Sequence, residues 1–292
     1  MAVPTDATDV FAIDTYDAPP LPTFESSFVT DMALYKHSTL SQDWKAVTRL
    51  LGATRLVPNA STAETGESDV TWDFMNGWYS NTGTASTVYS WMWKRAPNYF
   101  DVVAYTGTGS AMTVSHNLAA VPEMMWVKSR SNADDWAVYH SALGNTDNLF
   151  LNGSNATASR IYWNNTTPTA IQFSLGDSSK VSNSGTNYIA YLFASLDGVS
   201  KVGSVSHTSG TPTNVDCGFS AGARFIILKR YDAVSDWWVF DTERGIAVGN
   251  DARLILNTTA AETSTDQIDP YSAGFTIDSA RATGDYIFYA IA

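Results

Sequence analysis

The sequence has little cysteine, little charge and no long apolar run. Cys217 is its only cysteine, which excludes an intrachain disulfide and a secreted disulfide scaffold. Charged residues make up 16% of the 292 positions, so stability must come from packed apolar surface. No apolar run is long enough to span a bilayer, and the N-terminus lacks the basic region of a signal peptide. We therefore expect a protein that is soluble when made and does not insert into membranes.

Positive charge is scarce as well. The chain has 17 lysines and arginines against 29 aspartates and glutamates, a formal net charge of -12. Because lysine and arginine are what bind phosphate backbones and anionic lipid surfaces, this balance argues against a nucleic-acid partner and against a membrane surface. The sequence also lacks the common hydrolase, zinc-protease and nucleotide-binding motifs, and its four histidines do not stand at metal-ligand spacing. We predict no enzymatic activity and no cofactor.

One short stretch does occur three times: a lysine that closes an apolar run, then Asp-Trp with the aspartate seven positions after the lysine. The lysines are Lys36, Lys128 and Lys229, and the tryptophans are Trp44, Trp136 and Trp237. Two apolar runs around a polar link predict a β-hairpin, with the aspartate in the turn and the lysine in a solvent-exposed pair with it. The three tryptophans should therefore occupy equivalent positions in three repeats.

The repeats have about seven short apolar runs each and no amphipathic segment of helical period longer than two turns. We predict an all-β fold made of three tandem β-sandwich-like modules, an abridged one at 24–97 and two full ones at 98–198 and 199–292. The last strand of each repeat is apolar at nearly every position, so we expect it inside a sheet rather than at an edge.

The segment 1–23 differs from the repeats. It holds four of the ten prolines and no lysine or arginine, a composition that cannot bury enough apolar surface to fold alone. It predicts a short extended arm. One interpretation is a disordered acidic tail, and the other is a strap whose Phe11, Ile13 and Tyr16 pack on a partner. We expect residues 1–24 to be ordered only through another subunit.

One loop has the composition of a glycan contact. Tyr162 and Trp163 supply flat aromatic rings, which stack on sugars, and Asn164 and Asn165 supply amides that bond to hydroxyls. A tryptophan in such a loop is also typical of a core. Both interpretations stay open at this point.

Carboxylates suggest two further kinds of site. Asp135 and Asp236 invite comparison with the paired carboxylates of glycosidases, but their recurrence in repeats that differ elsewhere favours a turn role. The oxygen-rich stretches 145–148 and 266–269 are candidates for calcium, although neither has the EF-hand pattern. We assign no catalytic residue and no metal ligand.

Several motifs resemble the repeated C-terminal β-modules of tail-fibre-like virion proteins from tailed bacteriophages of marine and aquatic bacteria. They lie at 100–107, 135–141, 188–195 and 253–262. The likeness is strong over 85–292 and weak over 24–84, and its motifs are structural rather than catalytic.

The resemblance implies a virion protein, made in the host cytoplasm, that binds a host-surface receptor or glycan. It also implies a homotrimer, with other virion proteins contacted through the arm. The alternative is a capsid or tail decoration protein that binds no receptor.

Overall fold

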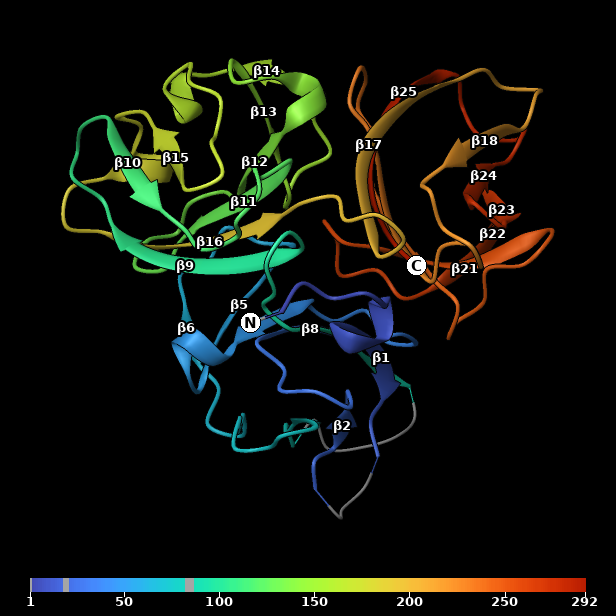
Figure 1. The fold of residues 1–292 in the computed structure, drawn as a ribbon, viewed down its shortest axis with the longest axis horizontal. Helices are drawn as coiled ribbons and strands as arrows, with labels where there is room; N and C mark the ends of the chain where they lie inside the picture. Colours follow the sequence, from blue (N-terminus) through green and yellow to red (C-terminus); the bar gives the residue numbers. More distant parts are fainter. Residues whose placement is uncertain (1, 18–20, 82–86) are drawn as a thin grey trace.

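The computed structural model describes residues 2–17, 21–81 and 87–292. Three β-rich units surround a common axis, one after another along the chain (Figure 1). Each unit has a six-stranded antiparallel sheet and a smaller antiparallel sheet. The predicted all-β fold of three tandem sandwich-like modules is confirmed.

The three large sheets have the same strand order. Unit 1 runs β1 (Phe11–Thr15), β8 (Val88–Trp93), β3 (Met32–His37), β4 (Lys45–Thr48), β5 (Thr54–Leu56), β6 (Thr65–Gly66). Unit 2 runs β9 (Phe100–Thr106), β16 (Asn187–Phe193), β11 (Met124–Ser129), β12 (Ala137–His140), β13 (Asp147–Phe150), β14 (Ala158–Ser159). Unit 3 runs β17 (Ser200–His207), β25 (Gly284–Ile291), β19 (Phe225–Arg230), β20 (Trp237–Asp241), β21 (Asn250–Ile255), β22 (Thr263–Asp266).

Small sheets cover the outer side of the large ones. They are formed by β2 (Phe24–Glu25) with β7 (Gly77–Trp78), by β10 (Met112–Ser115) with β15 (Gln172–Leu175), and by β18 (Thr213–Asp216), β24 (Gly274–Ile277) and β23 (Ile268–Tyr271). The helical turns are short: η1 (Ala7–Asp9), η2 (Arg49–Leu51), η3 (Ser141–Leu143), η4 (Ile161–Trp163) and α1 (Ser179–Ser182). No helix among the described residues is long and apolar enough to cross a membrane.

Alternation along the strands explains why their sequences are apolar at every position. In β11, Met124 and Trp126 point into a core shared by all three units, while Met125 and Val127 point into the core between the two sheets of unit 2. Successive side chains of a strand face opposite sides, so a strand covered on both sides needs apolar residues throughout. The last strands β8, β16 and β25 lie between two neighbours, as predicted.

The first strand corrects the predicted arm. Phe11–Thr15 pairs with β8 of its own chain and takes the place that β9 and β17 have in the other units. The Phe11 ring lies 5.1 Å from that of Trp93 and 5.2 Å from that of Phe225. Unit 1 therefore begins before residue 24, and the expectation that this segment is ordered only through another subunit is wrong for β1. Residues 1 and 18–20 of the arm, including Pro19 and Pro20, lie outside the described residues.

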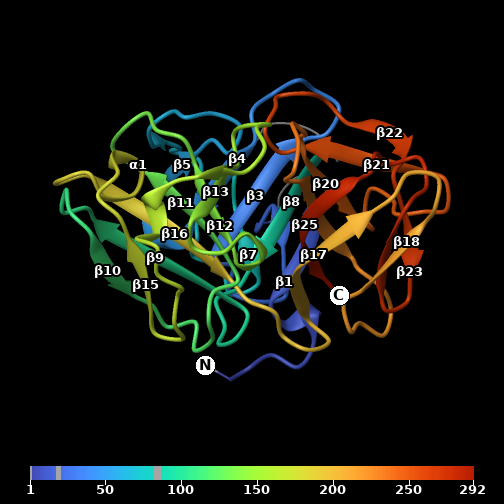
Figure 2. The same cartoon turned by 90° about the horizontal axis from the view of Figure 1, so that it is seen from above.

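The strands connect two ends of the central axis. We call the end with the β3–β4, β11–β12 and β19–β20 hairpin links the hairpin end; it holds Lys36, Lys128 and Lys229. The other, the linker end, holds Asp31, Glu123 and Arg224, which precede β3, β11 and β19. A strand of six residues separates them by roughly 20 Å. The N-terminus lies at one end of the axis (Figure 2), and it is the linker end, since Lys94 N–H donates to the Val10 carbonyl.

Candidate functional site

The boundaries between units, which we call seams, gather the repeated residues at the hairpin end. The first seam joins units 1 and 2, the second joins units 2 and 3, and the closing seam joins units 3 and 1. All three hairpins form as predicted, and the three tryptophans are fully buried.

Each repeated tryptophan donates a hydrogen bond to the unit that precedes its own in the circular order of the three units. The indole N–H of Trp136 donates to the Val57 carbonyl at 2.9 Å, that of Trp237 to Phe150 at 2.9 Å, and that of Trp44 to Ile255 at 2.9 Å. The predicted equivalence of the three positions is confirmed. Because a buried indole N–H needs an acceptor, each bond fixes the distance between two units.

The three lysines correct the predicted solvent-exposed pair. Each is fully buried, and the ammonium of Lys128 donates to the carbonyls of Ser61, Ser129 and Asn132 at 3.3, 2.7 and 3.2 Å. One acceptor in each case belongs to the neighbouring unit: Ser61 for Lys128, Ser154 for Lys229 and Thr259 for Lys36. The lysines therefore close the seams, and their partners are backbone dipoles rather than carboxylates.

Burial sets the charge state of these lysines. It lowers the pKa of Lys36, Lys128 and Lys229 to about 8, because a charged group loses its hydration, while the nearby aspartates act in the opposite direction. All three remain protonated at neutral pH. A protonated amine has three N–H donors, which is the number of carbonyls around Lys128.

We expected the aspartates of the repeated motif to bond to their own turn. In the structure each of them orients an asparagine instead. Asn152 accepts from the backbone N–H of Trp136 at 2.9 Å and donates its amide to Asp135 at 2.9 Å. The same pair of bonds links Asn257 with Trp237 and Asp236, and Asn59 with Trp44 and Asp43. Each aspartate thus orients an asparagine that bonds to the repeated tryptophan, which is a structural role.

The predicted glycan loop is corrected in part. The Trp163 ring is fully buried, 5.6 Å from the ring of Tyr139, and its indole N–H donates to the Asp147 carbonyl. Tyr162 is also buried, whereas Asn164 and Asn165 are exposed with φ of 50° and 47°. A buried ring cannot stack on a sugar, so only the two amides remain available to a ligand.

Three carboxylates lie close together in unit 3. Asp266, Asp269 and Asp278 each offer an oxygen, all within 4.8 Å of one another. Desolvation, with repulsion from Asp278 and Asp269, raises the pKa of Asp266. Carboxylate oxygens are ligands that calcium prefers, so these residues could hold a divalent cation, and two of them belong to the predicted stretch 266–269. Acidic clusters also occur without an ion, and no step of the proposed function depends on this one.

Two further titratable side chains, Cys217 and His140, are buried. Burial raises the pKa of the Cys217 thiol to about 12, which leaves it protonated and inert. Burial also lowers the pKa of His140 to about 4, and its Nδ1 accepts from the Ala142 N–H. Both groups are parts of the packed interior.

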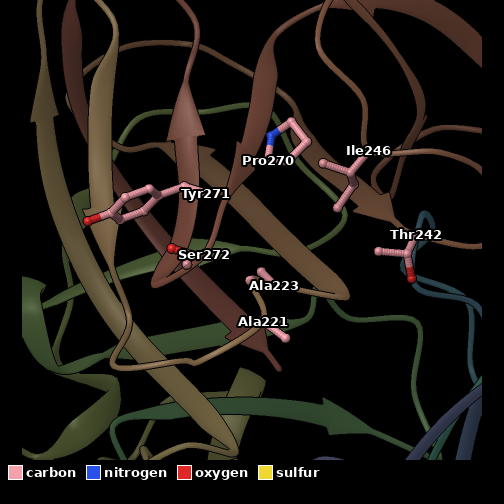
Figure 3. A pocket seen from close by; sticks show the side chains of 9 residues that line it. Ala221, Ala223, Thr242, Ile246, Pro270, Tyr271 and Ser272 are labelled. Carbon is pink, nitrogen blue, oxygen red and sulfur yellow. The ribbon is translucent and has the colours of Figure 1, made fainter.

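The hollows of the surface are small and open. One of about 180 Å³ in unit 3 is lined by Thr242, Ile246, Pro270, Tyr271 and small residues such as Ala223 (Figure 3). None of the described residues that line it is charged. A second hollow, of about 300 Å³, lies at the linker end and contains Asp31, Arg49 and Arg95. It brings opposite charges together beside the exposed side chain of Leu50.

Comparison with known proteins gives a family without an assigned activity. The family described as "Domain of unknown function (DUF7483)" matches residues 32–292. The chain belongs to this family. No curated protein matches the chain. The match begins at β3, so it covers all three seams but leaves out β1.

Sequence reasoning missed two features of this arrangement. The burial of the lysines had no local signal, because one carbonyl partner of each lysine lies in another repeat, which covers it. The charged hollow was missed because Arg49 and Arg95 are far apart in sequence and meet only when the fold brings the start of β3, the end of β4 and the linker after β8 together.

Proposed function

We propose that the chain is a bacteriophage virion protein of tail-fibre or spike type whose three-unit body binds the host surface, a receptor or a glycan. Support comes first from the sequence motifs at 100–107, 135–141, 188–195 and 253–262, which resemble such modules. The proposal includes no chemical reaction, since the repeated aspartates are engaged by asparagines.

The observation that carries the proposal is the contrast between a repeated interior and a variable exterior. The three units keep the same lysine, Asp-Trp and asparagine bonds at their seams. Outside the seams they differ: unit 3 has the extra strand β23, and unit 2 has α1 and η4. A rigid body that presents different loops on a repeated frame suits recognition, because binding residues need a scaffold that holds them in place.

The decoration alternative drew its support from the arm as a fastening. Phe11–Thr15 is used within the chain's own sheet, so this segment is not free to fasten the protein elsewhere. Contacts with other virion proteins through residues 2–10 remain part of the proposal.

A homotrimer also remains a prediction. The three seams are closed within one chain, so a trimer would have to use outer surface. Sedimentation should give three times the 31.7 kDa of the chain, and a monomer mass at micromolar concentration would contradict the trimer without affecting adhesion.

Adsorption tests the proposed function. Saturating host cells with the purified chain should block adsorption of the phage that encodes it, and antibodies against the chain should label the tail of its particles. The matched control is the chain after thermal unfolding. Normal adsorption to saturated cells, with label on the head alone, would favour the decoration role.

A further inference from the structure

The linker end shows which residues the fold requires there and which it does not. Backbone bonds establish equivalent positions in the three units: Arg49 N–H donates to the Asp31 carbonyl, Ser141 to Glu123, and Thr242 to Arg224. The first unit therefore has an arginine at a position where the same backbone bond is made by serine and threonine in the others.

The linkers between units also have equivalent positions that are established by the same backbone bonds. Arg95 N–H donates to the Asp31 carboxylate at 2.7 Å, and Ser195 N–H donates to the Glu123 carboxylate in the same way. The preceding residues, Lys94 and Ala194, also make equivalent backbone bonds. Unit 2 thus builds this corner with Ser141, Ala194 and Ser195, which means that the fold does not need Arg49 and Lys94 for their charge, whereas Arg95 pairs with the buried Asp101.

Two of these cations, Arg49 and Arg95, line one hollow with the Asp31 carboxylate. Burial raises the pKa of Asp31, while Arg95, Arg49 and Lys94 all act on it in the opposite direction. Arg95 is paired with the buried Asp101 at 2.6 Å. Among the described residues, neither Arg49 nor Lys94 has a carboxylate within 4.0 Å. Lys94 lines a neighbouring hollow together with Asp9, so Arg49 is the cation of this hollow that has no carboxylate partner among the described residues.

Arg49 is held in place without being neutralised. Its Nε donates to the Thr30 carbonyl at 2.9 Å, another nitrogen donates to the Trp72 carbonyl, and the guanidinium lies 5.5 Å from the centre of the Trp72 ring. These contacts are with dipoles and a ring face, and Nη2 is buried without a hydrogen-bond partner, so the positive charge is fixed beside the hollow and is not neutralised.

The hollow around these groups has the size and lining of a sugar subsite. Its volume is about 300 Å³, and Asp31, Thr48, Arg49, Leu50, Arg95 and Val102 line it. Leu50 is 51% exposed at its rim, where units 2 and 3 have Ala142 and Glu243. Fixed cations, one acceptor carboxylate and an exposed apolar side chain can together bind a carboxylate, a hydroxyl and a C–H face.

We propose that this hollow at the first seam binds an acidic sugar of an anionic host polysaccharide. The sugar's carboxylate lies against Arg49 and Arg95, a hydroxyl donates to Asp31, and the apolar face of the ring packs on Leu50. The inference rests on the proposed adhesive function and names the class of glycan recognised. Its charge requirement also predicts that salt weakens binding, because salt screens exposed charges.

Titration calorimetry with defined oligosaccharides tests the proposal. The full chain is titrated with a hexuronate oligomer, its methyl-ester form, a sulfated oligomer and a neutral one of equal length. We expect the hexuronate and sulfated oligomers to bind and the ester and neutral forms to bind at least tenfold more weakly. Equal affinity for all four, or binding of the neutral oligomer alone, would overturn the proposal.

Variants then locate the site. Arg49→Gln should weaken hexuronate binding about tenfold or more, which is the cost of about 1.4 kcal/mol for a lost charged contact. Arg160→Gln is the matched control, because Arg160 is an exposed arginine in unit 2 outside the hollow, and it should bind as the natural chain does. Thermal melts of all variants check folding. If Arg49→Gln stays folded and binds normally, the site is elsewhere.

The outcome separates this proposal from the adhesive function. Host cells stripped of acidic polysaccharide should no longer retain the chain. If the chain still blocks phage adsorption to such cells, adhesion stands and the acidic-sugar proposal falls. If it neither binds cells nor blocks adsorption under any condition, the adhesive function falls as well.

Discussion

The two ends of the molecule differ in how far their side chains recur among the three repeats. At the hairpin end, Lys128, Trp136 and Asn152 have counterparts in both other units, and each set makes the same bonds. At the linker end, Arg49 has a serine and a threonine as its counterparts. Side chains that recur in three diverged repeats are the ones the fold requires, whereas those at a position that tolerates serine are available for binding.

The largest effect should come from breaking a seam. Trp136→Ala removes a fully buried indole and leaves the Val57 carbonyl without its donor. Loss of packing and an orphaned acceptor should lower the free energy of unfolding by about 3–5 kcal/mol. Urea unfolding measures it, and a change below about 1 kcal/mol would show that the seam is not structural.

The buried lysines should make stability rise with pH. The pKa of each is about 8 in the folded chain against 10.5 ordinarily, so between these values the unfolded chain binds more protons. The free energy of unfolding then increases with pH. The burial penalty is present below pH 8 and relieved as the lysines lose their protons.

Two groups of residues limit that rise. Burial raises the pKa of Cys217 and of tyrosines such as Tyr191, so their ionisation favours the unfolded chain as pH increases. We expect a net gain on the order of 2 kcal/mol between pH 8 and 9. Urea unfolding at both pH values tests this, and Lys128→Met should remove about a third of the lysine contribution. If the free energy of unfolding of the natural chain stayed flat or fell over this pH range, the burial of the three lysines would be contradicted.

A smaller effect is expected from the motif aspartates. Asp135→Asn weakens the orientation of Asn152 and removes the ion pair with Lys180 at 2.8 Å, which is partly exposed. It should cost about 0.5–1 kcal/mol. Asp236→Asn is the matched variant without such a pair among the described residues. Release of reducing sugar from host polysaccharide that either change abolishes would refute the structural role.

The smallest change in stability should come from the linker end. Lys94→Ala installs the residue that unit 2 has at the same position, Ala194. The free energy of unfolding should stay within about 0.5 kcal/mol of that of the natural chain, as is usual for surface substitutions. A loss as large as that of Trp136→Ala would place Lys94 among the residues that the fold requires.

Local pattern was enough to predict the strands, the hairpins and the interior place of the last strand. The run Met124-Met125-Trp126-Val127 is apolar on both faces, and the structure buries both. The place of β1 could not be predicted in the same way. Its sequence alternates weakly, and its partner β8 lies more than 70 residues away, so an acidic, proline-rich context outweighed Phe11 and Ile13.

The errors at candidate sites have one cause, which is tertiary packing. The composition of the loop predicted that the Trp163 ring stacks on a sugar, but the ring packs beside Tyr139 in the core. Lysine and aspartate close together in sequence suggested an ion pair. In the structure the ammonium groups of the lysines donate to backbone carbonyls, and one of these in each case belongs to another repeat. The cationic corner had no sequence signal until the backbone bonds aligned Arg49 with Ser141.

The affinity for a hexuronate oligomer, measured by calorimetry for Trp136→Phe and Arg49→Gln at a temperature where both are folded, tests the division between the two ends most directly. Trp136→Phe loses a seam bond roughly 20 Å from the hollow, so its dissociation constant should equal that of the natural chain. Arg49→Gln should bind about tenfold or more weakly. Normal binding by Arg49→Gln with weakened binding by Trp136→Phe would contradict the account.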